Sequence, residues 1–296
     1  MSRGEVPEWS NGAVSKTVVR LRTQGSNPCL SAKTSQAVTN TILHEQRLLM
    51  ETLSNLLNFN LLLAALAVFP SGIIQGYAGF GGALVAVPFL AILFDPVTGF
   101  AIILFVVLFG QGSHFLNATK RANWVEVGPV AGASAITMTI GIIFLVSSDP
   151  EIIRKCMGVI ILCITSLMAS GWNYAGRRGM VSRLFTGGLS GAITGGFGVP
   201  GFPLQVLYFH SSTSTIEMKR LNVLAALACG LVVAIAGLTF QKIYTQEMLI
   251  RAFIIAPTFI VGAKLGGMIF QLAPADWFKK ITYLILFSTA VMLLVL

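Results

Sequence analysis

The sequence predicts an all-α, polytopic membrane protein built from two inverted repeats. Three observations indicate this fold class. Charged residues make up only 10% of the 296 residues, whereas soluble domains carry about 25%. The mean hydropathy is +0.80. Runs without Asp, Glu, Lys or Arg divide most of the chain, and the two longest of these runs carry similar Gly/Pro motifs.

Residues 1–49 form a polar segment that differs from the rest of the chain. The segment carries six Lys or Arg residues and has no apolar stretch of the kind that a secretory signal needs. Residues 8–16 and 25–31 look like the translated sequence of a transfer-RNA gene. We therefore expect either a disordered N-terminal extension or a reading frame whose true start is Met50.

Most charge-free runs beyond this segment fit one bilayer crossing each, which needs about 20 apolar residues. These runs are 96–119, 127–148, 156–176, 221–241 and 281–296, together with 252–275, which contains Lys264. Runs 52–94 and 184–216 are too long for one helix and short for two full helices with loops. We expect each of them to form a hairpin of two short helices.

Two pairs of motifs recur in the same order along the chain. Gly79-Phe80-Gly81 is matched by Gly196-Phe197-Gly198, 117 residues later, and prolines follow both motifs. Residues 151–155 are matched by residues 276–280, 125 residues later, and a proline just ahead of each match suits a helix start. The matches predict an internal duplication.

We expect the first repeat at residues 50–176 and the second at 177–296, each with one hairpin and three transmembrane helices. Three full crossings are an odd number, so the second repeat is upside down relative to the first. If Lys120 lies inside, so do Arg121, Arg177, Arg178, Arg183, Lys219, Arg220, Lys279 and Lys280. The basic residues on the other side are Arg154, Lys155, Lys242 and Arg251. This asymmetry obeys the positive-inside rule.

Glycines in the two long runs are of two kinds. Gly72 and Gly76, like Gly187, Gly191 and Gly195, are spaced by four and are expected to let helices pack closely. The remaining glycines of the motifs lie beside prolines or outside that spacing, which indicates breaks in the helices. Broken backbone at membrane depth is tolerated where it lines a cavity or is buried in protein.

Broken helices at corresponding places in two inverted halves indicate a transporter's binding site, and the amides at a break suit an anion. The candidate substrate-binding residues are Gln75, Gly79, Gly81, Gly82, Gly196, Gly198, Pro200 and Lys264. Gln75 lies just before the first break. Lys264 either extends to the membrane interface or acts as the counter-ion of an anion.

At the two breaks the chain resembles the sulfite exporter TauE/SafE family of bacterial inner-membrane transporters. Gly79-Phe80-Gly81-Gly82 with Val87-Pro88 matches the first motif of that family. The stretch from Gly196 to Pro200 matches the second motif less closely, because Val199 replaces a usual glycine. The resemblance covers residues 55–296. It implies export of sulfite or a small organosulfonate across the bacterial inner membrane without ATP hydrolysis.

The leading hypothesis is a secondary exporter of a small sulfur-containing anion, and a passive anion channel of the same architecture is the alternative. A membrane enzyme is less favoured, because no catalytic constellation is visible. The expected partners are the anionic substrate, a coupling ion that the sequence does not identify, and the lipid bilayer, with a homodimer as an option. Nucleic acid, cofactors and metal ions are not expected.

Overall fold

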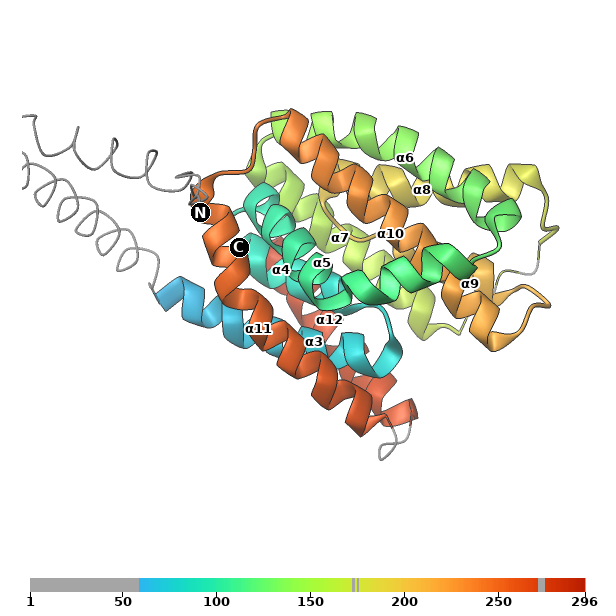
Figure 1. Ribbon diagram of the computed structural model, residues 1–296. Helices are drawn as coiled ribbons and strands as arrows, with labels where there is room; N and C mark the ends of the chain where they lie inside the picture. Colours follow the sequence, from blue (N-terminus) through green and yellow to red (C-terminus); the bar gives the residue numbers. More distant parts are fainter. Residues whose placement is uncertain (1–58, 172–173, 175, 271–274, 296) are drawn as a thin grey trace, which may run out of the picture. The chain divides into compact units, whose positions relative to one another are not determined.

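A computed structural model describes residues 59–171, 174, 176–270 and 275–295 (Figure 1). These residues belong to one compact unit, Leu57–Leu296. The expected N-terminal extension at 1–49 lies outside the described residues.

Ten helices, α3 to α12, make up the described part of the chain, which contains no strand. In chain order they are α3 (Phe59–Ala78), α4 (Gly82–Leu93), α5 (Pro96–Arg121), α6 (Trp124–Ser147), α7 (Pro150–Ala169), α8 (Met180–Phe197), α9 (Phe202–His210), α10 (Ile216–Phe240), α11 (Gln246–Ile269) and α12 (Ala275–Val295). Six of them are long and apolar enough to cross a membrane, namely α3, α5, α6, α7, α10 and α11. The prediction of an all-helical, multi-pass membrane protein is therefore confirmed.

Local sequence explains where the long helices begin. Asp95 caps α5 by accepting the Thr98 N–H at 2.9 Å, and Asp149 caps α7 by accepting the Glu151 N–H at 2.7 Å. Both helices have proline at the first position, where its missing N–H costs no hydrogen bond. The polar cap residues interrupt the apolar runs, so they determine where one helix ends and the next begins.

Both long charge-free runs form hairpins, α3–α4 and α8–α9, but the expectation of two short helices in each is wrong. The first arms have 20 and 18 residues, whereas the second arms have 12 and 9. The reason lies in where the backbone turns. Gly79 and Gly198 follow the first arms with φ of 83° and 66°, a left-handed conformation that favours glycine.

The two breaks correspond at a spacing of 119 residues rather than the 117 that the sequence indicated. Gly79 donates its N–H to the Gln75 carbonyl, and Gly198 donates its N–H to the Thr194 carbonyl. Gly196 is still inside α8, so it is not the counterpart of Gly79.

Small residues bring two helix pairs into close contact. The first arm α3 packs along α11, and the first arm α8 packs along α6, as Figure 1 shows. At Gly72 an added Cβ would overlap with the Phe259 carbonyl, and at Gly191 it would overlap with the Ser134 carbonyl. The expected packing role of the glycines spaced by four is confirmed at these positions.

Candidate functional site

The two broken hairpins face each other around a central cavity of about 90 Å³. The first hairpin contributes Gln75 and Gly81, and the second contributes Pro200 and Gln205. Helices α5, α6 and α10 complete the walls, which are mostly apolar. The structure thus brings together breaks that lie more than one hundred residues apart in the chain.

The tips of the hairpins also touch directly. The Phe80 ring packs edge-on against the Phe202 ring, with centroids 5.9 Å apart, and lies 6.5 Å from the His210 ring. An added Cβ at Gly81 would lie 3.6 Å from Phe202 Cζ. The loop of the first hairpin therefore packs against α9 of the second.

A side chain of the first arm spans each break. Gln75 Oε1 accepts the Gly82 N–H at 2.9 Å, and Thr194 Oγ1 accepts the Gly201 N–H at 2.9 Å. Gln75 Nε2 also donates to the Gly79 carbonyl at 3.2 Å. The expectation that the first amides after the breaks are free for an anion is wrong for Gly82 and Gly201, because these side chains already accept them.

Gly196 and Gly198 lie outside the lining of the central cavity. Gly196 packs in α8 against Gly141 of α6. Gly198 turns the chain beside α5, where an added Cβ would lie 3.3 Å from Phe100 Cβ. These two predicted site residues shape the hairpin and do not line the cavity, and the predicted Gly82 lies outside the lining of the central cavity as well.

A second, cationic pocket of about 350 Å³ lies next to the first break. Its lining includes Gln75, Gly79 and Lys264, which were predicted, together with His114 and Arg220. Gln75 lines both this cationic pocket and the central cavity, so the two spaces adjoin at that side chain.

Arg220 is a site residue that the sequence analysis missed. Its guanidinium lies over Gly79, where an added Cβ would be 2.9 Å from Nη2. The sequence placed Arg220 only among the basic residues expected inside, because nothing local links it to a break 141 positions earlier. Neither Arg220 nor Lys264 forms an ion pair within the part of the chain that the structure describes. Their positive charges are available to attract an anion.

Three polar side chains in the cavity lining, Ser134, Ser190 and Gln205, were not among the predicted site residues either. Gln205 donates from Nε2 to Ser190 Oγ at 2.9 Å. Gln205 Oε1 and Ser134 Oγ have no hydrogen-bond partner among the described residues, although both side chains are buried in the cavity wall. If the two hairpins are aligned at a spacing of 119 residues, Ser71 matches Ser190. That alignment would have indicated Ser190 and its neighbours as candidate site residues.

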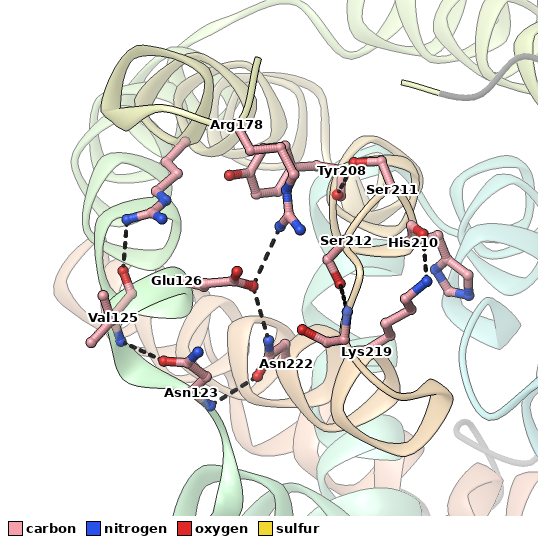
Figure 2. Close-up of polar contacts among 12 residues, drawn as sticks. Asn123, Val125, Glu126, Arg178, Tyr208, His210, Ser211, Ser212, Lys219 and Asn222 are labelled. Atoms are coloured by element: carbon pink, nitrogen blue, oxygen red, sulfur yellow. Dashed lines mark hydrogen bonds and ion pairs between the residues drawn. The ribbon is translucent and has the colours of Figure 1, made fainter. Parts of the chain in front are cut away.

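A polar cluster connects the start of α8 and the end of α9, the two ends of the second hairpin that lie away from its break (Figure 2). Glu126 at the start of α6 pairs with Arg178 at 3.3 Å and accepts from Asn222 Nδ2 at 3.4 Å. Asn222 Oδ1 accepts the Asn123 N–H at 2.9 Å, and the Arg178 guanidinium stacks 4.7 Å above the Tyr208 ring. The cluster joins α6, α9, α10 and the segment before α8 at one end of the helices.

No three His, Cys, Asp or Glu side chains come together to hold a metal ion within the described residues. The side chains around the two adjoining spaces supply hydrogen bonds and positive charge.

These features define a multi-pass α-helical membrane protein in which broken helices enclose a central cavity next to a cationic pocket. Such an arrangement is the one that transporters use to hold a small solute away from lipid. The sequence model of the family described as sulfite exporter TauE/SafE matches residues 63–293, so the chain belongs to this family of membrane transporters, which are not enzymes. No curated protein and no solved structure matches the chain.

Proposed function

We propose that the protein is a secondary transporter that exports a small sulfur-containing anion, sulfite or an organosulfonate, across the bacterial inner membrane. The observation that carries the proposal is the junction at Gln75. There the cavity between the two breaks adjoins a pocket that contains Arg220 and Lys264. An anion attracted by these charges would have a short path into the cavity.

We also propose that residues 50–176 and 177–296 are repeats. Support comes from reciprocal packing, since the first arm of each hairpin packs along the fourth helix of the other half. Gly72 approaches Phe259, and Gly191 approaches Ser134 in the same way. The two glycines are 119 residues apart in the chain, and the two residues that they contact are 125 residues apart. The same helix contact is therefore found once for each hairpin.

The direction of the helices favours an inverted arrangement of these repeats. Along α8 and α6, Gly191 meets Ser134 and Gly195 meets Met138, so both helices run the same way. Along α3 and α11, Gly72 meets Phe259 and Gly76 meets Ala263, so these two helices also run the same way. Between α6 and α11 the chain makes two full crossings, α7 and α10, and one hairpin that returns to its starting side. The helices α6 and α11 would therefore run in opposite directions. Since each hairpin's first arm runs parallel to one of them, the two hairpins would enter the membrane from opposite sides.

Contacts at the hairpin ends agree with this topology. The last turn of α9 returns to the start of α8, where Arg178 stacks on Tyr208. The end of α4 meets the start of α11, where the Arg251 guanidinium lies 4.8 Å from the Phe94 ring. Each second arm therefore returns to the end of the molecule from which its first arm started.

The mechanism would be alternating exposure of the central cavity. An anion from the cytoplasm would collect in the cationic pocket, pass Gln75 and enter the cavity between the breaks. Rocking of one half against the other would then open the cavity to the opposite side, as in other transporters with inverted repeats. No nucleotide chemistry enters this cycle.

Flux measurements in vesicles test the proposal against the passive-channel alternative. Purified protein is reconstituted into liposomes, and labelled sulfite is followed while a proton or sodium gradient is imposed. A secondary transporter accumulates sulfite beyond its equilibrium distribution under at least one gradient. Sulfite that equilibrates under every gradient identifies a channel, and sulfite that does not cross at all excludes it as the substrate.

A further inference from the structure

We infer that the central cavity binds its substrate as a singly charged oxyanion that keeps a proton, with Ser134 and Gln205 as its hydrogen-bonding pair. This inference rests on the proposed function and specifies the ionic form of the substrate. For sulfite, the bound species is hydrogen sulfite, so one proton moves with each sulfite group. The inference concerns the cavity alone and not the cationic pocket.

The described wall of the cavity carries no charged side chain. Among the described residues that line it, none is Asp, Glu, Lys, Arg, His, Cys or Tyr, and the polar side chains are neutral amides and hydroxyls. Moving an ion from water into such surroundings is costly, and the cost grows with the square of the charge, so a dianion costs about four times as much as a monoanion. The wall therefore selects against the fully deprotonated dianion.

The starts of α4 and α9 supply a limited positive charge to the cavity. Gly81 and Ala83 at the start of α4 line the cavity, as do Gly201 and Phe202 at the start of α9. Each helix N-terminus carries the equivalent of about half a positive charge. Because Gln75 and Thr194 already accept the amides of Gly82 and Gly201, the two ends together compensate at most about one negative charge and leave a second one uncompensated.

Two buried side chains in the cavity wall have unused hydrogen-bonding capacity. Gln205 is 4% exposed and Ser134 is 3% exposed, and both line the cavity. Gln205 Oε1 and Ser134 Oγ have no partner within the described residues. Leaving such buried groups unpaired costs free energy, which a ligand that binds them would recover.

The pair requires particular chemistry from that ligand. Ser134 Oγ–H can donate to an oxyanion oxygen. Gln205 Nε2 donates to Ser190 Oγ, so Gln205 Oε1 remains as an acceptor that needs a donor. Fully deprotonated sulfite has acceptors only. Hydrogen sulfite has both acceptors and one acidic hydrogen, so it can serve both side chains together.

The fold itself does not need this polar pair. The position of Ser134 on α6 corresponds to Phe259 on α11, because both contact the equivalent glycines of the hairpins. Gln205 stands four residues after Gly201, and the residue four after Gly82 is Ala86. The corresponding place in the other half is thus filled in each case by a fully buried apolar residue, Phe259 for Ser134 and Ala86 for Gln205. The polar pair belongs to ligand binding and not to helix packing.

Binding of two ligands to the purified protein tests the inference. Labelled sulfite and methanesulfonate, which stays a monoanion without an acidic hydrogen, are titrated from about pH 6 to about pH 9. The apparent affinity for total sulfite should fall by about tenfold per pH unit once the dianion dominates. The affinity for methanesulfonate should stay constant, which excludes a titrating group of the protein as the cause.

Three variants locate the effect. Gln205→Leu, or Gln205→Met if the first folds poorly, should weaken sulfite binding about tenfold and leave methanesulfonate binding unchanged. Ser134→Ala should weaken both ligands. Thr165→Val removes another buried hydroxyl without a partner, on α7 and outside the cavity lining, and should change neither affinity. Monodisperse elution of each variant shows that it is folded.

Other results overturn the inference in distinguishable ways. Sulfite affinity that is constant or rises with pH shows that the dianion binds, and the inference fails while the proposed function stands. Equal weakening of both ligands by Gln205→Leu removes the role of Gln205 as an acceptor. If neither ligand binds at any pH, the proposed function fails together with the inference.

Discussion

Gln75 Oε1 accepts the backbone N–H of Gly82 at 2.9 Å, across the break between the two arms of the first hairpin. The same side chain donates to the Gly79 carbonyl and lines both the central cavity and the cationic pocket. Thr194 and Gly201 repeat the first of these contacts in the second hairpin. One side chain of each first arm thus holds the chain where the helix is interrupted.

Replacing Gln75 by leucine should therefore loosen the first break. The Gly82 N–H loses its buried acceptor, which costs about 1–3 kcal/mol. We expect a lower melting temperature and loss of most sulfite efflux in vesicles. Thr194→Val is the matched change in the second hairpin and should lower the melting temperature in the same direction. A melting temperature that neither change affects would show that these hydrogen bonds do not hold the breaks.

The glycines at the breaks should be needed for transport more than for folding. Gly81 has φ of 105° and Gly198 has φ of 66°, so alanine at either place strains the backbone by about 1–2 kcal/mol and shifts the hairpin loop. We expect Gly81→Ala and Gly198→Ala to reduce sulfite efflux more than tenfold, with efflux normalised to monodisperse protein.

Gly191→Ala is the control for a glycine that only packs. Its new Cβ would overlap with the Ser134 carbonyl, so α8 could not approach α6. We expect this variant to lose folded protein, and the efflux per folded molecule to fall much less than the yield. Near-normal efflux from both Gly81→Ala and Gly198→Ala would exclude a role of the breaks in transport.

We expect the cationic pocket to attract the free anion before it enters the central cavity. Arg220→Gln and Lys264→Gln each remove one positive charge from its lining. We expect the KM for sulfite to rise several-fold with little change in kcat, because the charges attract the free anion. The initial rate of the unmodified protein should fall with ionic strength, and this salt dependence should weaken in both variants.

Lys219→Gln is the matched control for the cationic pocket. Lys219 is next to Arg220 in the chain, but its Nζ donates to the His210 carbonyl at 2.9 Å and it does not line the pocket. The KM of this variant should stay close to that of the unmodified protein. An equal rise in KM for Lys219→Gln and Arg220→Gln would indicate a general surface effect.

The proposed inverted topology predicts the side on which single cysteines react. In a background in which the native cysteines are replaced by serine, cysteine at position 120 should be labelled from the cytoplasmic side. Cysteine at position 242 should be labelled from the opposite side, because α10 separates it from the end that carries Arg121 and Glu217. Labelling of both positions from one side would contradict the inverted arrangement.

The sequence by itself determined the class of protein and the places where its helices are interrupted. A bilayer demands apolar runs of about 20 residues and tolerates few charges within them, so the spans can be recognised from local composition. Glycine and proline change the backbone at their own positions, so the breaks near Gly79 and Gly198 could be predicted as well. The spacing by four of Gly72 and Gly76 indicated a packing face for the same local reason.

Only the tertiary structure decided which side chains surround the breaks. Arg220 lies over Gly79, and Ser134 shares a cavity with Gln205, because of how helices distant in the chain pack together. The spacing of 119 residues between the two breaks likewise depends on where the backbone turns, which the motif sequences alone do not reveal. The same holds for the hydrogen bonds that the amides of Gly82 and Gly201 already form. Such contacts join residues through space, and the charge or polarity of one position does not reveal its neighbour across the bundle.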